Sequence, residues 1–275
     1  MAEIQTGSFV IGSDPRKQPE ILRVVSWNIN RGLELKAVID FLAASPADLI
    51  LLQETDVNAR RTQCGNIPCE IAQALHMNYA FGREFEELAQ GEVSSPAYHG
   101  QAILSRWPIL RPHVLKFRRQ SKFWRPRWFI PPLQVFQRRL GARMALICEI
   151  SIQGRAVSVY NVHLESRGRD ELRRNQLFEI LAEIRRNSPE MEVLVAGDLN
   201  LDISRGRIAN LIAETQLDNP LADLGRCPTA RSRQRKGAAI DWILISKGLI
   251  ASSPQIHDAV CGSDHYPISV QIRLA

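Results

Sequence analysis

Residues 192–202, EVLVAGDLNLD, decide how the rest of the chain is interpreted. The apolar run 193–196 has the length and the β-branched content of a buried strand, and Gly197 marks its exit. Residues two apart on an extended chain point to the same side, so Asp198 and Asn200 can share one pocket. A carboxylate beside a carboxamide at the mouth of a buried strand suits metal-assisted attack by water.

The segments around this stretch alternate unevenly between strand and helix patterns. Strands are predicted at 22–30, 48–53, 100–105, 143–152, 156–164, 240–245 and 266–272, and helices at 35–44, 68–76, 170–186 and 206–214. Residues 153–155 read as a hairpin turn. This pattern favours an α/β (α+β) fold with two packed mixed sheets flanked by helices. We expect one domain over residues 21–275, preceded by a poorly ordered tail, residues 1–20.

The composition of the chain limits the cellular compartments in which the protein is expected. The chain has 275 residues, of which 45% are hydrophobic, enough for one sizeable core. No run approaches the roughly 20 apolar residues of a membrane span, and the first residues lack the pattern of a secretory signal. Five cysteines, an odd number in a chain of this length, argue against a disulfide scaffold. These features predict a cytoplasmic protein without an obligate protein partner.

Positive charge is concentrated in two segments. Ten Lys or Arg residues lie in 111–143, and five more lie in 226–236. Removing these fifteen charges changes the formal net charge from +6 to −9. An acidic body with two basic segments predicts a phosphate-rich partner, either a nucleic acid or an anionic lipid surface.

Polar residues interrupt the ends of the apolar runs, where ligand-handling groups gather in α/β architectures. Taken singly, each is more typical of a turn, a helix cap or a structural histidine. Eight such residues in succession indicate a site. They are Asn28, Glu54, His163, Asp198, Asn200, Asp241, Asp264 and His265.

Their local contexts resemble a known family. The segments WNIN (27–30), QE (53–54), VHLES (162–166), GDLN (197–200), IDWIL (240–244) and SDHYP (263–267) are similar to the ordered motifs of the endonuclease/exonuclease/phosphatase (DNase I-like) superfamily. The resemblance covers about residues 22–272. It implies the four-layered α/β sandwich of that family and a metal-dependent hydrolase of phosphodiester or phosphomonoester bonds.

The resemblance also implies roles for the eight residues. Glu54 is expected to be the principal ligand of Mg²⁺, or of Mn²⁺ as a substitute, with Asn28 and Asp264 close to the ion or its waters. Asp198 is expected to orient or deprotonate the attacking water, and Asn200 to hold that water or the phosphate. His265, fixed by Asp241, and His163 are expected to contact phosphate oxygens.

The string HLESR at 163–167, followed by Arg174 and Gln176, is similar to the corresponding stretch of 5′-tyrosyl-DNA phosphodiesterases. The chain departs from that group after GDLNL, where it has Asp202-Ile203 instead of Arg-Asp.

The sequence leaves the substrate open. Segment 111–140 has little periodicity and is expected to be irregular, with Arg interleaved with Trp and Phe. This composition suits nucleic acid, an anionic membrane surface, or a loop packed on the domain. A nuclease or DNA-end-processing enzyme is favoured, with DNA as the preferred partner. A sphingomyelinase-like phospholipid phosphodiesterase or an inositol-phosphate phosphatase is the alternative. A non-catalytic polyanion-binding module is the third class.

Overall fold

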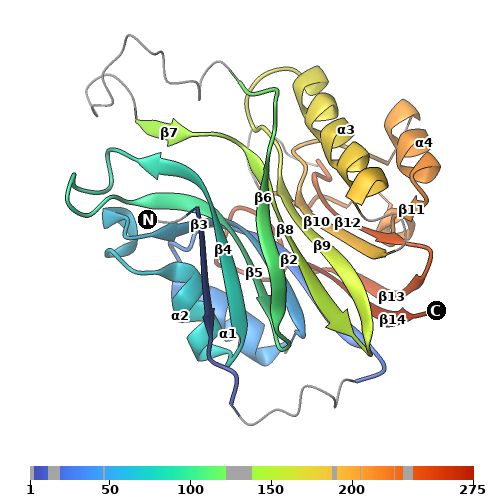
Figure 1. Ribbon diagram of the computed structural model, residues 1–275, viewed down its shortest axis with the longest axis horizontal. Helices are drawn as coiled ribbons and strands as arrows, with labels where there is room; N and C mark the ends of the chain where they lie inside the picture. The colour runs from blue at the N-terminus through green and yellow to red at the C-terminus, as the bar shows by residue number, and fades with distance from the viewer. Residues whose placement is uncertain are drawn as a thin grey trace.

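Two β-sheets packed face to face form the centre of the protein in a computed structural model (Figure 1). The structure describes residues 3–11, 19–45, 47–121, 138–187, 191–204, 206–225, 227–231 and 238–275. The cation-aromatic stretch at 122–129 and most of the basic run 226–236 therefore lie outside the described residues.

The first sheet has the strand order β1-β4-β5-β3-β2-β14-β13, with β7 paired to β4. Its strands are β1 (Ile4–Ser8), β2 (Leu22–Arg31), β3 (Leu49–Val57), β4 (Asn78–Glu87), β5 (Tyr98–Ser105), β7 (Arg139–Gly141), β13 (Leu249–Ile256) and β14 (Ile268–Leu274). The central pair β2/β3 is parallel and the other pairs are antiparallel, so the sheet is mixed.

The second sheet has the order β11-β12-β10-β9-β8-β6. Its strands are β6 (Ile109–Lys116), β8 (Met144–Ile152), β9 (Arg155–His163), β10 (Glu192–Asp198), β11 (Leu217–Asp218) and β12 (Asp241–Ser246). Only β9 and β10 pair in parallel. This sheet therefore repeats the arrangement of the first, with a parallel pair at its centre.

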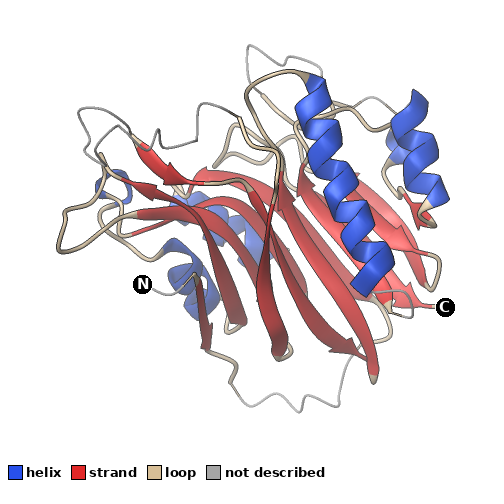
Figure 2. Ribbon diagram, turned by 45° about the horizontal axis from the view of Figure 1, so that its top comes forward, coloured by secondary structure: helices blue, strands red, loops and turns tan. Residues whose placement is uncertain are grey.

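Helices cover the outer faces of both sheets (Figure 2). Helices α1 (Leu35–Ala44) and α2 (Ile67–Ala74) pack on the first sheet, and α3 (Asp170–Asn187) and α4 (Gly206–Glu214) on the second. Short 3₁₀ turns occur at Arg60–Thr62 and Ala222–Leu224. No described helix combines the length and apolar character that a membrane crossing would need.

Strand alternation explains why the layers pack in this way. In β3, Leu49 and Leu51 belong to the core between the sheets, whereas Ile50 and Leu52 pack under the helices α1 and α2. Successive side chains of a strand point to opposite faces, so a stretch that packs against apolar layers on both faces has a continuous apolar sequence. The continuous apolar runs in the sequence reflect this double burial.

A polar bridge crosses the core between the two sheets. Asn161 of β9 donates hydrogen bonds from its Nδ2 to the carbonyl oxygens of Leu52 (2.9 Å) and Ala102 (2.8 Å) in the first sheet. Its Oδ1 accepts a hydrogen bond from Gln53 Nε2 at 2.7 Å. Buried amides are tolerated when they find partners, and here the partners belong to the opposite layer.

The predicted four-layered α/β sandwich is confirmed, but two expectations about the chain need correction. Residues 4–8, expected in a poorly ordered tail, form β1 and pair with β4. Residues 111–116, included in the irregular segment 111–140, belong to β6 and pair with β8. Both are edge strands, where only one neighbour and one packed face constrain the sequence pattern.

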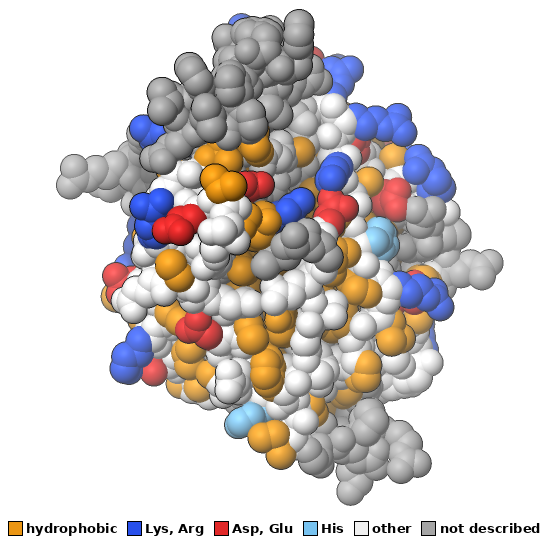
Figure 3. Space-filling view, turned by 60° about the vertical axis from the view of Figure 1, so that its left-hand side comes forward, with side chains coloured by type: hydrophobic (Ala, Val, Ile, Leu, Met, Phe, Trp, Pro, Cys, Tyr) orange, Lys and Arg blue, Asp and Glu red, His pale blue; other side chains and the backbone are white. Residues whose placement is uncertain are grey.

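Charged side chains of both signs share the surface. On the face shown in Figure 3, Lys and Arg side chains lie beside Asp and Glu side chains. Lys116, for example, lies 2.6 Å from Glu3, and both side chains are exposed. Part of the positive charge on the described residues is therefore compensated locally.

Substitution of Gly197 tests how closely β10 packs against β9. Its φ is +148°, and a Cβ at this position would lie 1.9 Å from the carbonyl oxygen of Val162 in β9. Gly197→Ala is therefore expected to lower the free energy of unfolding by about 2–6 kcal/mol, from backbone strain plus overpacking. Urea denaturation measures the change.

Gly154→Ala is the matched control for that prediction. Gly154 has φ +82° in the hairpin between β8 and β9, and nothing lies within 4 Å of a Cβ built there. Its cost should be limited to about 1–2 kcal/mol of left-handed strain. Equal losses in the two variants would show that Gly197 is not needed for the close approach of β9.

Candidate active site

The eight predicted site residues gather at one end of both sheets. The carboxyl ends of β2, β3, β9 and β10 meet the amino ends of β12 and β14 there, as the strand registers require. Asp198, for example, is the register partner of both His163 and Asp241. Parallel central pairs in both sheets thus bring segments far apart in sequence to one edge.

Asp198 lies at the centre of the cluster and is 2% exposed. Its Oδ1 accepts a hydrogen bond from the backbone N–H of Asn200 at 2.8 Å, and its Oδ2 accepts one from Asn28 Nδ2 at 3.2 Å. The same Oδ2 lies 3.6 Å from His163 Nε2 and 3.7 Å from His265 Nε2. One carboxylate is therefore held by residues of both sheets and faces two imidazoles.

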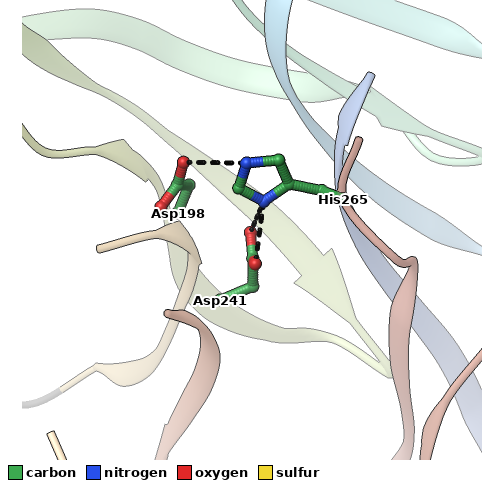
Figure 4. Close-up of side chains that lie close together, drawn as sticks. All are labelled: Asp198, Asp241 and His265. Atoms are coloured by element: carbon green, nitrogen blue, oxygen red, sulfur yellow. Dashed lines mark hydrogen bonds and ion pairs between the residues drawn. The ribbon is translucent and has the colours of Figure 1, made fainter. Parts of the chain in front are cut away.

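His265 lies between two carboxylates (Figure 4). Its Nδ1–H donates to Asp241, at 2.9 Å from Oδ2 and 3.1 Å from Oδ1. Burial lowers the pKa of His265, but Asp241 and Asp198 overcome that effect and raise its pKa to about 10. The ring is therefore a charged imidazolium at neutral pH, with Nε2–H directed towards Asp198.

His163 has the opposite electrostatic setting. The ring is buried, and its Nδ1 lies 2.9 Å from Nη1 of Arg143. Burial, and then the positive charge of Arg143, hold the pKa of His163 well below its ordinary value. The site therefore contains one charged and one neutral histidine, both close to Asp198 Oδ2.

Glu54 reaches the site because the backbone departs from regular strand geometry. Its φ is +51°, and the registers of β3 with β2 and with β5 both shift around this residue. Its side chain is 19% exposed and lies 3.5 Å from Nη2 of Arg31. Burial would raise the pKa of Glu54, but the positive charges of Arg31 and, to a lesser degree, Arg143 hold it well below its ordinary value. Glu54 is thus an ionised carboxylate with access to a ligand.

The loop before β14, which contains Asp264, is tied to Asn28 through Ser263. Ser263 Oγ donates to the carbonyl oxygen of Asn28 at 2.6 Å, and the N–H of His265 donates to Ser263 Oγ at 3.2 Å. Asp264 itself is exposed, and its charge contributes to the raised pKa of His265. Asn200 donates its side-chain Nδ2 to the carbonyl oxygen of Leu164 at 3.1 Å. All eight predicted residues therefore belong to one neighbourhood.

The residues fit a hard divalent cation. Ligand atoms of Asp198, Asp241 and His265 lie within 4.8 Å of one another, so these three could hold an ion. An imidazolium has no lone pair to offer, however, and His265 is charged in this arrangement. The ionised carboxylate of Glu54, with the Asn28 amide on the neighbouring strand, offers the oxygen ligands that Mg²⁺ and Mn²⁺ prefer.

Sequence reasoning missed the buried charges beside the site. Arg143 is 2% exposed and pairs with Glu84, whose side chain is fully buried. A second pair, His99 and Asp56, is also buried, with His99 Nδ1 2.8 Å from Asp56. Arg143 is one of ten cations in its segment, and nothing in that charge pattern separates a buried arginine from exposed ones.

Comparison with known families agrees with this geometry. The model of the endonuclease/exonuclease/phosphatase family matches residues 25–265, a span that includes all eight site residues. The chain belongs to the endonuclease/exonuclease/phosphatase family. Membership supports a hydrolase that acts on phosphoester bonds. No curated protein sequence matches the chain.

Several solved structures have the same fold. An endonuclease/exonuclease/phosphatase from Beutenbergia cavernae is 18% identical with a TM-score of 0.69, covering 94% of this chain and 72% of its own. The human Nocturnin catalytic domain with bound sulfate is 15% identical, TM-score 0.65, with 99% and 97% covered. Humanized D. rerio TDP2 is 19% identical, TM-score 0.61, with 93% and 100% covered. At these identities the likeness shows the fold alone.

Proposed function

We propose that this protein is a Mg²⁺- or Mn²⁺-dependent phosphodiesterase that acts on nucleic acid, with DNA favoured. The observation that carries the proposal is the buried carboxylate of Asp198, held by Asn28 and Asn200 and facing two histidines of opposite charge state. A carboxylate oriented in this way can accept a proton from an attacking water. The charged His265 beside it can stabilise negative charge that develops on a phosphate.

Each residue has a task in this reaction. Asp198 orients and deprotonates the water, and Asn200 supports Asp198 through its backbone N–H. His265 donates Nε2–H to a phosphate oxygen, while Asp241 keeps the ring oriented and charged. His163 makes the second phosphate contact. Glu54 and Asn28, with Asp264 near the water shell, would hold the cation, which neutralises phosphate charge and stabilises the leaving oxygen.

The charge distribution favours a long polyanion over a small phosphate ester as the substrate. Segments 111–143 and 226–236 supply fifteen cations to an otherwise acidic chain. A long polyanion presents many phosphates to such basic segments, whereas a small phosphate ester presents one or a few. The HLESR string keeps a 5′-tyrosyl DNA end among the candidate substrates, and a TDP2 protein is among the proteins of similar fold. All five cysteines are free thiols, and a cytoplasmic location remains a prediction.

A substrate panel tests the proposal. Metal-stripped protein is assayed with and without Mg²⁺ or Mn²⁺ against plasmid DNA, single-stranded DNA, RNA, a 5′-tyrosyl oligonucleotide, sphingomyelin vesicles and an inositol polyphosphate. We expect cleavage of a DNA substrate that appears with added metal and disappears with chelator. Turnover of vesicles or inositol phosphate alone would overturn the nucleic-acid assignment. Salt-sensitive DNA binding without any cleavage would favour a polyanion-binding module.

Glu54→Gln separates metal dependence from other causes of inactivity. The substitution keeps the shape of the side chain and removes its negative charge, so the metal concentration for half-maximal activity should rise, by about 10-fold or more. Glu34→Gln is the matched control, because Glu34 is an exposed residue just before α1. An unchanged metal requirement in Glu54→Gln would contradict the assignment of Glu54 as the principal ligand.

A further inference from the structure

Arg143 is a buried arginine that links the two sheets at the edge of the site. Arg143 lies immediately before β8, and its guanidinium reaches Glu84 of β4, with Nη1 2.9 Å from Glu84 Oε2. The same Nη1 lies 2.9 Å from His163 Nδ1, and Nη2 lies 3.4 Å from Ser166 Oγ. The guanidinium carbon also lies 5.5 Å from the centre of the Phe85 ring. These contacts fix its position closely.

The contact with His163 determines which ring nitrogen carries the proton. A guanidinium has only donors and stays protonated, so Nδ1 of His163 must accept with its lone pair. Nη1 carries two hydrogens, one for Glu84 and one for His163. A neutral imidazole that accepts at Nδ1 bears its hydrogen on Nε2. A doubly protonated ring would place an N–H against the N–H of Arg143.

The Nε2–H of His163 is available to a ligand. Among the described residues this buried atom has no hydrogen-bond partner, and its 3.6 Å separation from Asp198 Oδ2 is too long for a good hydrogen bond. A buried donor without a partner is costly, and such groups are found where a ligand completes the bond. Here the donor faces the carboxylate that is assigned to the attacking water.

We propose that Arg143 is a positioning residue that holds His163 as its Nε2–H tautomer, so that His163 acts as a hydrogen-bond donor to a phosphate oxygen and does not act as a base. The identity of that ligand rests on the proposed function. The tautomer itself follows from the Arg143 contact alone. The two histidines then interact with the phosphate in different ways. His163 donates a hydrogen bond as a neutral ring, whereas His265 carries a positive charge.

Glu84 provides the means to separate positioning from folding. Its Oε1 accepts from Gln101 Nε2 at 2.8 Å, and its Oε2 pairs with Arg143. Arg143→Met alone would leave a buried carboxylate without its cation and could unfold the chain. The double variant Glu84→Gln/Arg143→Met removes both charges. Glu84→Gln is its matched control, since it keeps Arg143 and the bond to His163.

The test is the tautomer of His163 in the full chain, read from long-range ¹H–¹⁵N correlation spectra of its imidazole. The signal is assigned by its absence in His163→Gln. We expect an unprotonated Nδ1 and a protonated Nε2 in the wild type and in Glu84→Gln. In the double variant we expect the Nδ1–H form to be populated as well. A wild-type ring with Nδ1–H, or a double variant with an unchanged spectrum, would overturn the inference.

Kinetics on a cleaved phosphodiester give a second readout. Relative to Glu84→Gln, the double variant should lose about 10- to 100-fold in kcat, the usual cost of an unsupported histidine at a reaction centre. Circular dichroism shows whether both variants fold, and the wild-type spectrum decides the tautomer even if they do not. Inactivity towards every phosphoester, together with the Nε2–H tautomer, would reject the proposed function and leave the role of Arg143 standing.

Discussion

Asp198→Asn is expected to lower kcat for phosphodiester cleavage by about 10²- to 10⁴-fold, the range that loss of a general base produces. The amide keeps the size of the carboxylate but cannot accept a proton from water. KM should change little, because Asp198 is assigned to the water and other residues hold the phosphate. Steady-state kinetics with saturating Mg²⁺ measure both constants.

Asp202→Asn is the matched control for this prediction. Asp202 lies four residues further along the same segment, is exposed, and accepts hydrogen bonds from Ser204 at 2.9 Å and 2.6 Å. The Asp202→Asn substitution therefore removes the same charge outside the site, and the kcat of this variant should stay near the wild-type value. An Asp198→Asn protein that folds, as shown by circular dichroism, yet keeps more than about a tenth of wild-type kcat would contradict the role of general base.

Asp241→Asn is expected to lower the pKa of His265 by roughly two or more units, because it removes the nearest opposite charge while burial continues to favour the neutral ring. At neutral pH the variant would lose much of its imidazolium, and kcat should fall by about 10- to 100-fold. Proton NMR titration of the His265 ring in metal-free protein measures the shift. His257, whose Nε2 contacts Ser269 Oγ at 2.8 Å and has no carboxylate in its hydrogen bond, is an internal reference.

The same substitution changes how stability depends on pH. The folded-state pKa of His265, about 10, lies above the ordinary value of 6.5. Its stabilising contribution is therefore fully present below pH 6.5 and is lost as pH rises towards 10. Urea denaturation at several pH values across this window should show wild-type stability falling with pH and a flatter profile in Asp241→Asn. If the free energy of unfolding depended on pH in the same way in both proteins, that result would contradict the charged state of His265.

Much of the fold was predictable because strands buried on both faces contain continuous apolar runs in the sequence. Strands β3 and β10 contain the continuous apolar runs 49–52 and 193–196, and their positions were predicted to within a few residues. Strand β4 was missed because Glu84 and Glu87 are buried within it, and β6 and β13 each contain a proline near a sheet edge. Local propensity cannot report that a buried glutamate is paired with an arginine distant in sequence.

The site also has features that the sequence predicts and features that it does not predict. Asn28, Asp198 and His265 were recognisable because each interrupts the end of an apolar run in a familiar context. The contact between Arg143 and His163 was not, since it depends on how β8 and β9 place two side chains relative to β4. The structure also shows that Glu54 reaches the site through a positive φ, and no residue preference signals such a conformation for glutamate.

The bridge from Asn161 to the first sheet has a consequence for catalysis. Asn28 and Glu54 belong to one sheet, whereas His163, Asp198 and Asp241 belong to the other, so sliding of one layer over the other would pull the reaction centre apart. An offset of about 1 Å between reacting groups can cost roughly 100-fold in rate. Directional bonds from Asn161 to Leu52 and Ala102 resist that shear in a way that apolar contacts alone do not. Activity should therefore be sensitive to residues deep in the core that never meet the substrate.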